Sequence, residues 1–251
     1  GKGTNLCAFT QNSFVNGHSL VAANDVDLSI HIAEVDYNGD FKESTPFTYN
    51  ELGYSTGFPC LSFDGATAMY FSSNRPGGLG GYDIYVSYLN DGVWSYPENL
   101  GTSINTPGNE ITPFFDTKSL MFASDYHQGL GGFDIFKSVV NNGAWEFPEN
   151  MGRGVNSPAD DYFPAKLNES DDIYFSSNRL GGRGKDDIYI AAPNFKNDIA
   201  QAFEDENQDN IFVPKAVSLA DMNPFNGLES SSRNQNASAV SLKETAAEKV
   251  V

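Results

Sequence analysis

The chain has 251 residues and a formal net charge of −18 at pH 7. A surface this acidic repels phosphate groups, which argues against nucleic-acid binding and against adsorption to anionic lipid. No run of about 18 or more apolar residues occurs, so the sequence predicts no membrane-spanning helix and no direct membrane insertion. Phe (19) and Tyr (12) are abundant, as suits the half-buried faces of β-sheets.

In chain order, the first segments with strand character are Leu6–Phe9, Asp27–Ile30 and Gly39–Phe41. Residues 57–101 then contain a set of four predicted strands, separated by tight-turn signals (Asp-Gly, Asn-Asp-Gly) and by a Gly-rich loop over residues 74–81. The four are Phe58–Phe63, Ala68–Ser73, Tyr82–Tyr88 and Val93–Tyr96. Labelled A to D in this order, they predict one antiparallel sheet.

The second and third of these strands, with the loop between them, belong to a segment that occurs three times. Its copies start 51 and 53 residues apart and read FSSNRPGGLGGYDIY (71–85), FASDYHQGLGGFDIF (122–136) and FSSNRLGGRGKDDIY (175–189). The fourth strand and its linker also recur, as Trp-x-x-Pro-Glu-Asn at 94–99 and 145–150. A repeat of this length, built from short strands and Gly-rich turns, predicts an all-β fold, a β-propeller of four-stranded antiparallel blades.

Four blades can be counted, at roughly 5–56, 57–110, 111–161 and 162–200, which places the propeller domain at 1–225. The first blade is degenerate and lacks strand A. We expect residues 211–217 (IFVPKAV) to supply that strand and so close the ring, because a closed ring removes exposed sheet edges. The alternative is that further blades precede this sequence. Residues 226–251 are polar and of low complexity, which predicts a linker or disordered tail.

The combined motif, F-[SA]-S-[ND]-x(3)-G-x-G-x-x-D-I-[YF] followed by W-x-x-P-E-N, resembles the TolB-type, WD-like propeller repeat found in OmpA-family envelope proteins of Bacteroidota. The resemblance covers residues 57–192 well and 5–56 loosely, and it does not extend to 193–251. It implies a periplasmic or outer-membrane location, envelope proteins as partners and membership of a larger complex. Some members of that family belong to the type IX secretion and gliding apparatus.

An aspartate recurs in every predicted blade, namely Asp27, Asp83, Asp134 and Asp187. Such residues could form a ring of carboxylates around the channel. The favoured interpretation is structural, because Asp near a turn readily accepts hydrogen bonds from backbone N–H groups of its own loop. The glycines of these loops superficially suggest a phosphate cradle, but a strand follows them instead of a helix, so we expect them to supply positive φ angles.

Residues that differ between the repeats are better candidates for binding. The loops between the second and third strands of the blades lie on one face of a propeller, and they carry six side chains suited to a protein or peptide partner. These candidates are Arg75, Tyr126, His127, Arg179, Arg183 and Lys185. The alternative is that they only keep the loops soluble.

Metal and catalytic signals are weak. Asp205, Asn207 and Asp209 have the alternating oxygen ligands of a calcium loop, but the glycine and the bidentate Glu of that loop are missing. The sequence has no nucleophile-elbow motif, and Cys7 and Cys60 align with apolar strand positions, which favours two buried free thiols over a disulfide. We therefore expect no cofactor and no enzymatic activity, and a protein-interaction scaffold. The alternative is a glycan-binding or glycan-hydrolysing propeller, which would need two carboxylates about 5–10 Å apart in one pocket.

Overall fold

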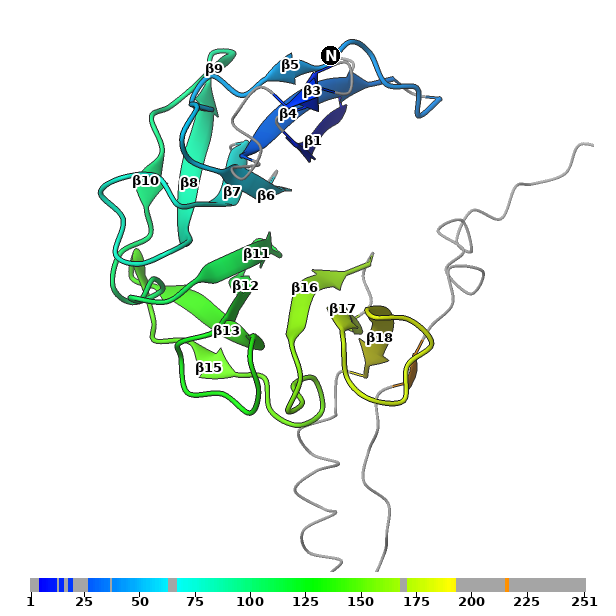
Figure 1. The fold of residues 1–251 in the computed structure, drawn as a ribbon. Coiled ribbons are helices and arrows are strands. Elements are labelled where there is room, and N and C mark those ends of the chain that lie inside the picture. The colour runs from blue at the N-terminus through cyan, green and yellow to red at the C-terminus, as the bar shows by residue number, and fades with distance from the viewer. Residues whose placement is uncertain are drawn as a thin grey trace, which may run out of the picture. The chain divides into compact units, whose positions relative to one another are not determined.

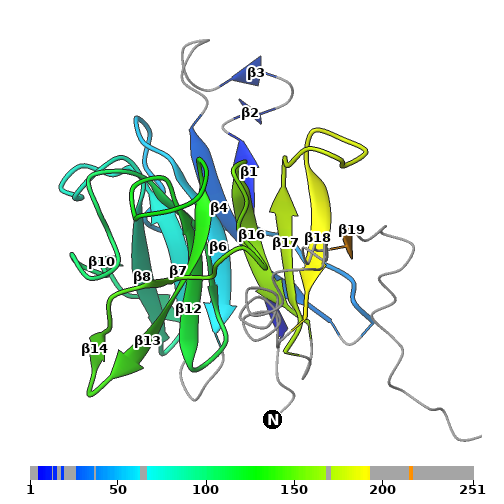
Figure 2. The ribbon, with the colours of Figure 1, turned by 90° about the horizontal axis from the view of Figure 1, so that it is seen from below.

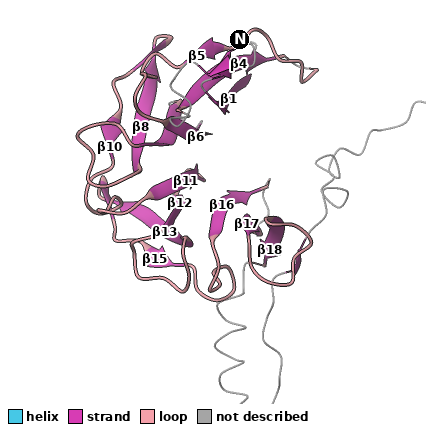
Figure 3. Cartoon of the chain, viewed as in Figure 1, coloured by secondary structure: helices cyan, strands magenta, loops and turns pink. Residues whose placement is uncertain are grey.

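The structure is a computed structural model that describes residues 5–12, 14–15, 18–19, 27–36, 38–62, 67–167, 171–192 and 215–216 (Figure 1). The calcium candidates Asp205, Asn207 and Asp209 and the predicted tail 226–251 lie outside the described residues. Within the described part every regular element is a strand (Figure 3). No helix in it has the length and apolar character needed to cross a bilayer.

The strands form four antiparallel sheets, which are the blades of a four-bladed β-propeller. Blade 1 contains β1 (Asn5–Asn12), β4 (Leu28–Val35) and β5 (Thr45–Pro46); blade 2 contains β6 (Thr56–Ser62), β7 (Ala68–Ser73), β8 (Asp83–Asn90), β9 (Val93–Trp94) and β10 (Glu98–Asn99). Blade 3 contains β11 (Glu110–Phe115), β12 (Ser119–Ser124), β13 (Asp134–Asn141), β14 (Ala144–Trp145) and β15 (Glu149–Asn150). Blade 4 contains β16 (Asp161–Lys166), β17 (Ile173–Ser177), β18 (Asp187–Ala191) and β19 (Lys215–Ala216). A separate hairpin joins β2 (Phe14–Val15) and β3 (His18–Ser19).

The four sheets stand around a common centre, with β6, β11 and β16 as the innermost strands of blades 2 to 4 (Figure 1; Figure 2 shows the strands from below). Of the segment 211–217, which the sequence predicts as the inner strand of blade 1, the structure describes Lys215 and Ala216. These two residues pair with β18, where Ala216 faces Tyr189 as Asn99 faces Tyr85 in blade 2. They therefore lie at the outer edge of blade 4 and not in the inner strand of blade 1.

Blade 1 has three strands in the described part of the chain, and its inner position is vacant there. The hydrogen bonds of Asn50 to Ile30 identify β4 as the counterpart of β8, so β1 is the counterpart of β7 and the sheet ends at β1. When β4 is superposed on β8 in this way, the residue equivalent to the repeated Asp83 is Ser29 and not Asp27. Asp27 has a different role, since its Oδ2 accepts a hydrogen bond from the backbone N–H of Gly53 at 2.8 Å.

The hydrophobic core lies between successive blades. One buried cluster joins blades 1 and 2 around Phe47 and Phe71, a second joins blades 2 and 3 around Ile84 and Phe122, and a third joins blades 3 and 4 around Ile135. The first aromatic residue of each repeat stacks on the aromatic residue opposite it in the next strand, as in the Phe71–Tyr85 pair. Because each blade buries its faces against its neighbours, a single blade has little core of its own.

A repeated asparagine in the linkers binds the outer edge of the third strand in each of blades 1 to 3. Asn105 Oδ1 accepts a hydrogen bond from Ile84 N at 2.7 Å, and its Nδ2 donates to Ile84 O at 2.9 Å. Asn156 binds Ile135 and Asn50 binds Ile30 in the same way. The amide thus replaces a neighbouring strand where the short outer strand has ended, and keeps that edge from being left unpaired.

We expect Asn105→Ala to lower the free energy of unfolding by about 2 kcal/mol, because the substitution leaves the buried N–H of Ile84 without its acceptor. Urea unfolding followed by tryptophan fluorescence measures the change. Thr102→Ala, at an exposed position of the same linker, is the control and should stay close to wild type. Equal effects of the two substitutions would contradict this role of Asn105.

Candidate functional site

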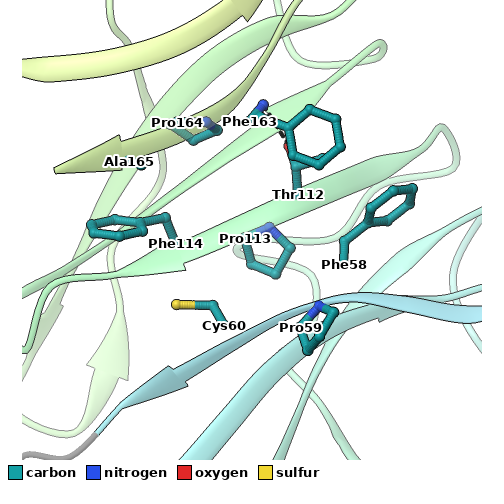
Figure 4. Close-up of a pocket in the computed structure, with 9 residues that line it drawn as sticks. All are labelled: Phe58, Pro59, Cys60, Thr112, Pro113, Phe114, Phe163, Pro164 and Ala165. Atoms are coloured by element: carbon teal, nitrogen blue, oxygen red, sulfur yellow. Dashed lines mark hydrogen bonds between the residues drawn. The ribbon is translucent and has the colours of Figure 1, made fainter. Parts of the chain in front are cut away.

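A pocket of about 280 Å³ lies at the centre of the propeller, between the inner strands β6, β11 and β16 (Figure 4). Three consecutive residues from each strand line it, at equivalent places in the three blades. They are Phe58-Pro59-Cys60, Thr112-Pro113-Phe114 and Phe163-Pro164-Ala165. Three prolines, three phenylalanines, an alanine, a thiol and a single hydroxyl make a lining that is almost entirely apolar.

A β-bulge in each inner strand gives the pocket its shape. The pairing register of β6 with β7 shifts between Gly57 and Cys60, so that two residues face one, and β11 and β16 have the same shift. The first bulged residue has a positive φ in all three strands, at 55° for Phe58, 52° for Thr112 and 53° for Phe163. Such angles are unfavourable for bulky residues, and they tend to persist where a site requires them. Their repetition around one pocket therefore marks it as a candidate site.

Contacts across the centre bring the bulges of different blades together. The rings of Phe58 in blade 2 and Phe163 in blade 4 meet edge to face, with centroids 5.6 Å apart. The backbone N–H of Phe163 donates a hydrogen bond to Thr112 Oγ1 at 3.1 Å, which fixes the bulge of blade 4 against that of blade 3 (Figure 4). The wall of the pocket is therefore set by packing between blades.

Cys60 is the one titratable residue in the lining. Burial raises the pKa of its thiol, while the hydrogen bond that its Sγ accepts from Phe115 N at 3.3 Å lowers it less. A thiol with a raised pKa stays protonated at neutral pH and is a poor nucleophile. The described structure contains both cysteines as free thiols. The pocket is thus suited to receiving an apolar group.

Two of the predicted binding residues, Arg75 and Arg179, are not on a free loop surface. Arg75 is only 7% exposed, and its guanidinium lies over the rings of Phe71 and Tyr85, with the carbon 5.6 and 5.0 Å from the centroids. Arg179 lies over Phe175 and Tyr189 in the same way. Each cation covers the stacked aromatic pair of its own blade, which makes it part of the core.

Both arginines also bind the linker from the preceding blade. Arg75 donates a hydrogen bond to the carbonyl oxygen of Tyr49 at 3.3 Å, and Arg179 donates to that of Val155. Arg179 further forms an ion pair with Asp161, whose side chain is fully buried. The sequence pattern does not indicate this role of the arginines, because the linker carbonyls come from another part of the repeat. We call the cation, the aromatic pair below it and the linker carbonyl the interblade clamp.

His127 takes the cation's place in blade 3. Its ring packs against Phe122 and Phe136, with centroids 6.0 and 5.1 Å away, and its Nε2 lies 3.0 Å from the carbonyl oxygen of Ile104 in the preceding linker. Tyr126, which aligns with the arginines in sequence, is instead 61% exposed. The imidazole thus completes the same interblade clamp from one position further along the chain.

The remaining predicted binding residues, Tyr126, Arg183 and Lys185, are exposed on the loops between the second and third strands of blades 3 and 4. Of the six residues proposed from sequence, these three are exposed, His127 and Arg179 are half-buried and Arg75 is buried. None of the six lines the central pocket.

The repeated aspartates hold their own loops. Asp83 Oδ2 accepts hydrogen bonds from Leu79 N at 2.5 Å and Asn99 Nδ2 at 2.9 Å, and Asp134 Oδ2 accepts from Leu130 N and Gly131 N. Asp187 Oδ2 accepts from Arg183 N and Gly184 N. These are the bonds expected for the structural interpretation. No group of three or more metal-ligating side chains occurs in the part of the chain described.

The glycines of these loops have two different uses. Gly77 and Gly181 have positive φ, as expected from the sequence. Gly80 is needed for close approach, because a Cβ there would lie 2.4 Å from the carbonyl oxygen of Thr106 in the following linker. Gly131 meets Ala159 O in the same way, at 2.2 Å. The linkers between blades 2 and 3 and between blades 3 and 4 are therefore each held by a glycine loop of the blade before and by an interblade clamp of the blade after.

Comparisons with known proteins find only distant structural similarity. No family model matches the chain, and no curated protein matches it. Among solved structures, a protein of unknown function from Dyadobacter fermentans DSM 18053 has a TM-score of 0.47 and 14% identity, over 74% of this chain and 48% of that one. A puromycin-hydrolysing peptidase of Mycobacterium tuberculosis has a TM-score of 0.33 and 12% identity, over 74% and 37%. The chain thus spans less than half the length of either structure.

We expect Arg179→Met to lower the free energy of unfolding by about 3–5 kcal/mol, because it leaves the buried carboxylate of Asp161 without its cation. Arg183→Met, at an exposed position of the same loop, is the matched control, with an expected change of about 0.5 kcal/mol or less. Chemical denaturation of both variants measures the difference. A stable Arg179→Met protein would show that the clamp does not hold the blades.

Protonation of the Glu110 carboxyl group should make the folded protein more stable as the pH is lowered. Glu110 aligns with Asp161, but no arginine forms an ion pair with it among the described residues. Burial raises the pKa of its carboxyl group above the ordinary 4.5, and hydrogen bonds from Thr106 and Ser124 lower the pKa by less. Since the folded state then binds the proton more tightly than the unfolded chain, stability rises as pH falls through the raised pKa, and the gain is complete below 4.5.

Comparison with Glu110→Gln isolates this contribution, because the other carboxylates cancel in the difference. We expect the free energy of unfolding of the variant to fall further below that of wild type at pH 5 than at pH 7.5, as measured by urea denaturation. The same deficit at both pH values would show that Glu110 does not titrate differently in the two states.

Proposed function

We propose that this chain is a non-enzymatic β-propeller that acts as a protein–protein interaction scaffold in the bacterial cell envelope. The observation that carries the proposal is the central pocket, whose apolar walls are built by strained bulges in three blades. Buried apolar pockets are where anchor side chains of protein partners contribute most of the binding energy. A lining whose single titratable group is a protonated thiol supports binding in preference to catalysis.

The location and the partners rest on the repeat motif. Its resemblance to OmpA-family envelope proteins of Bacteroidota supports a periplasmic or outer-membrane place and membership of a larger complex, with type IX secretion or gliding as the assembly to test first. The formal charge of −18 supports protein partners over nucleic acid or anionic lipid. No feature of the pocket favours the glycan alternative, because none of its lining residues carries a carboxylate.

Affinity capture tests the scaffold. The wild-type chain serves as bait for solubilised outer membranes of a Bacteroidota bacterium, with mass spectrometry and polysaccharide analysis as readouts. Ala165→Phe places a ring in the pocket, and Leu180→Phe places one on a loop position that is fully exposed. We expect one saturable protein partner that Ala165→Phe reduces at least tenfold and Leu180→Phe leaves unchanged.

The melting temperatures of the two variants must match for this comparison. Capture that is insensitive to Ala165→Phe would remove the pocket from the proposal. Retention of polysaccharide without a protein would replace the scaffold with the glycan alternative.

A further inference from the structure

The joint between blades 2 and 3, meaning the linker between them and the contacts that hold it, differs in charge from the joint between blades 3 and 4. Each has an acidic residue with 0% exposure at the start of the inner strand, Glu110 or Asp161. Arg179 pairs with Asp161, whereas no Lys or Arg pairs with Glu110 among the described residues. In blade 3 the clamp has His127 in place of an arginine. An arginine keeps its charge at every pH at which proteins fold, and a histidine is charged only in acid.

The hydrogen bonds of Glu110 are of a kind that can accommodate a proton. Its Oε2 accepts from the backbone N–H of Thr106 at 2.8 Å, and the hydroxyls of Thr106 and Ser124 lie 2.6 and 2.7 Å from its Oε1. A hydroxyl both donates and accepts, so these contacts can be kept with either protonation state. In blade 4, Asp161 Oδ1 faces the guanidinium of Arg179, which only donates. Protonation of Asp161 would leave that positive charge unpaired.

The surroundings of Glu110 contain little that compensates a negative charge. Burial raises the pKa of its carboxyl group, the hydrogen bonds that it accepts lower the pKa by less, and the charge of His127 has the smallest effect. Glu110 faces Ser124 in the sheet, and Ser124 faces Asp134, a second buried carboxyl group whose pKa burial also raises. Asp125, next to the clamp, is a further acidic residue and is exposed. His127 is therefore the one group facing Glu110 in the described structure that can supply a positive charge.

Local opening of the joint is coupled to the protonation of Glu110. A carboxyl group that reaches water when the linker opens returns towards its ordinary pKa of 4.5. Because the closed joint has the raised pKa, it binds the proton more tightly than the open joint does. The closed form is therefore favoured most below pH 4.5, and this advantage is lost as the pH rises through the raised value.

We propose that the joint between blades 2 and 3 is a pH-dependent switch, which stays closed when Glu110 is protonated and opens more often when Glu110 is ionised. Arg179 keeps the joint between blades 3 and 4 closed in both conditions. The switch acts on the loop between β12 and β13, because Ser124 Oγ, which donates to Glu110, accepts the N–H groups of Tyr126 and His127 where that loop begins. Acid thus fixes the loop that presents the exposed ring of Tyr126. This regulation goes beyond the proposed scaffold and does not depend on it.

Two equivalent amides test the proposal in one molecule. The N–H of Thr106 bonds to Glu110 Oε2 at 2.8 Å, and the N–H of Ser157 bonds to Asp161 Oδ2 at 2.6 Å. Amide hydrogen exchange of the full chain is followed by NMR at pH 5.0 and pH 7.5, and each rate is divided by its intrinsic value. We expect the protection of Thr106, relative to that of Ser157, to fall at least fivefold from pH 5.0 to pH 7.5. A change in global stability affects both amides alike and cancels in this ratio.

Two variants assign the response to one carboxyl group. Glu110→Gln keeps the size of the side chain and removes its titration, so the ratio should change less than twofold between the two pH values. Glu98→Gln, at an exposed position of β10, is the matched control and should keep the full fivefold change. The comparison of Thr106 with Ser157 in the wild-type chain needs no variant, so it decides the matter even where Glu110→Gln does not fold.

Two results would overturn the proposal. A ratio in the wild-type chain that is the same at both pH values would show that the joint does not respond to pH. A fivefold change that persists in Glu110→Gln would assign the response to another group. Exchange is measured on the chain alone, so either result leaves the scaffold proposal to be decided by envelope capture.

Discussion

The interblade clamp is the interaction on which the rest of the structure depends. Each blade buries its apolar faces only against its neighbours, so the relative position of two blades must be fixed by contacts that span the linker between them. A cation stacked on the aromatic pair of one blade and bonded to the linker carbonyl does this in blades 2 and 4, and His127 does it in blade 3. The strained bulges of the inner strands keep their geometry because this frame holds the blades that carry them.

The central pocket follows from the same frame. Three inner strands contribute the same kind of triplet, and a proline in each triplet removes one donor from a backbone that is already bent. The result is a concave apolar surface in a chain whose overall charge is strongly negative. A strong net charge favours solubility in water, and a concave apolar surface is suited to burying an apolar group.

Much of the fold could be predicted from the sequence because the repeat is local. Strand order, turn positions and the loop-holding role of Asp83 and Asp134 depend on residues within one blade. The role of Arg75 could not be predicted, because a loop arginine becomes a core residue only through the register of an aromatic pair and a carbonyl from the previous linker. The pocket, in contrast, does have a sign in the sequence, an Xaa-Pro dipeptide that recurs at 58–59, 112–113 and 163–164. The place of Lys215–Ala216 could not be predicted, because it depends on pairing with β18, a strand more than 20 residues earlier in the chain.

The linkers also bear on the order in which the protein folds. Arg75, His127 and Arg179 bind linker carbonyls that lie only 26, 23 and 24 residues earlier in the chain. Contacts of such short separation cost little loop entropy and form early. The contacts that fix one blade on the one before it are therefore complete within a stretch of chain little longer than half a repeat, and they do not depend on the blades that follow.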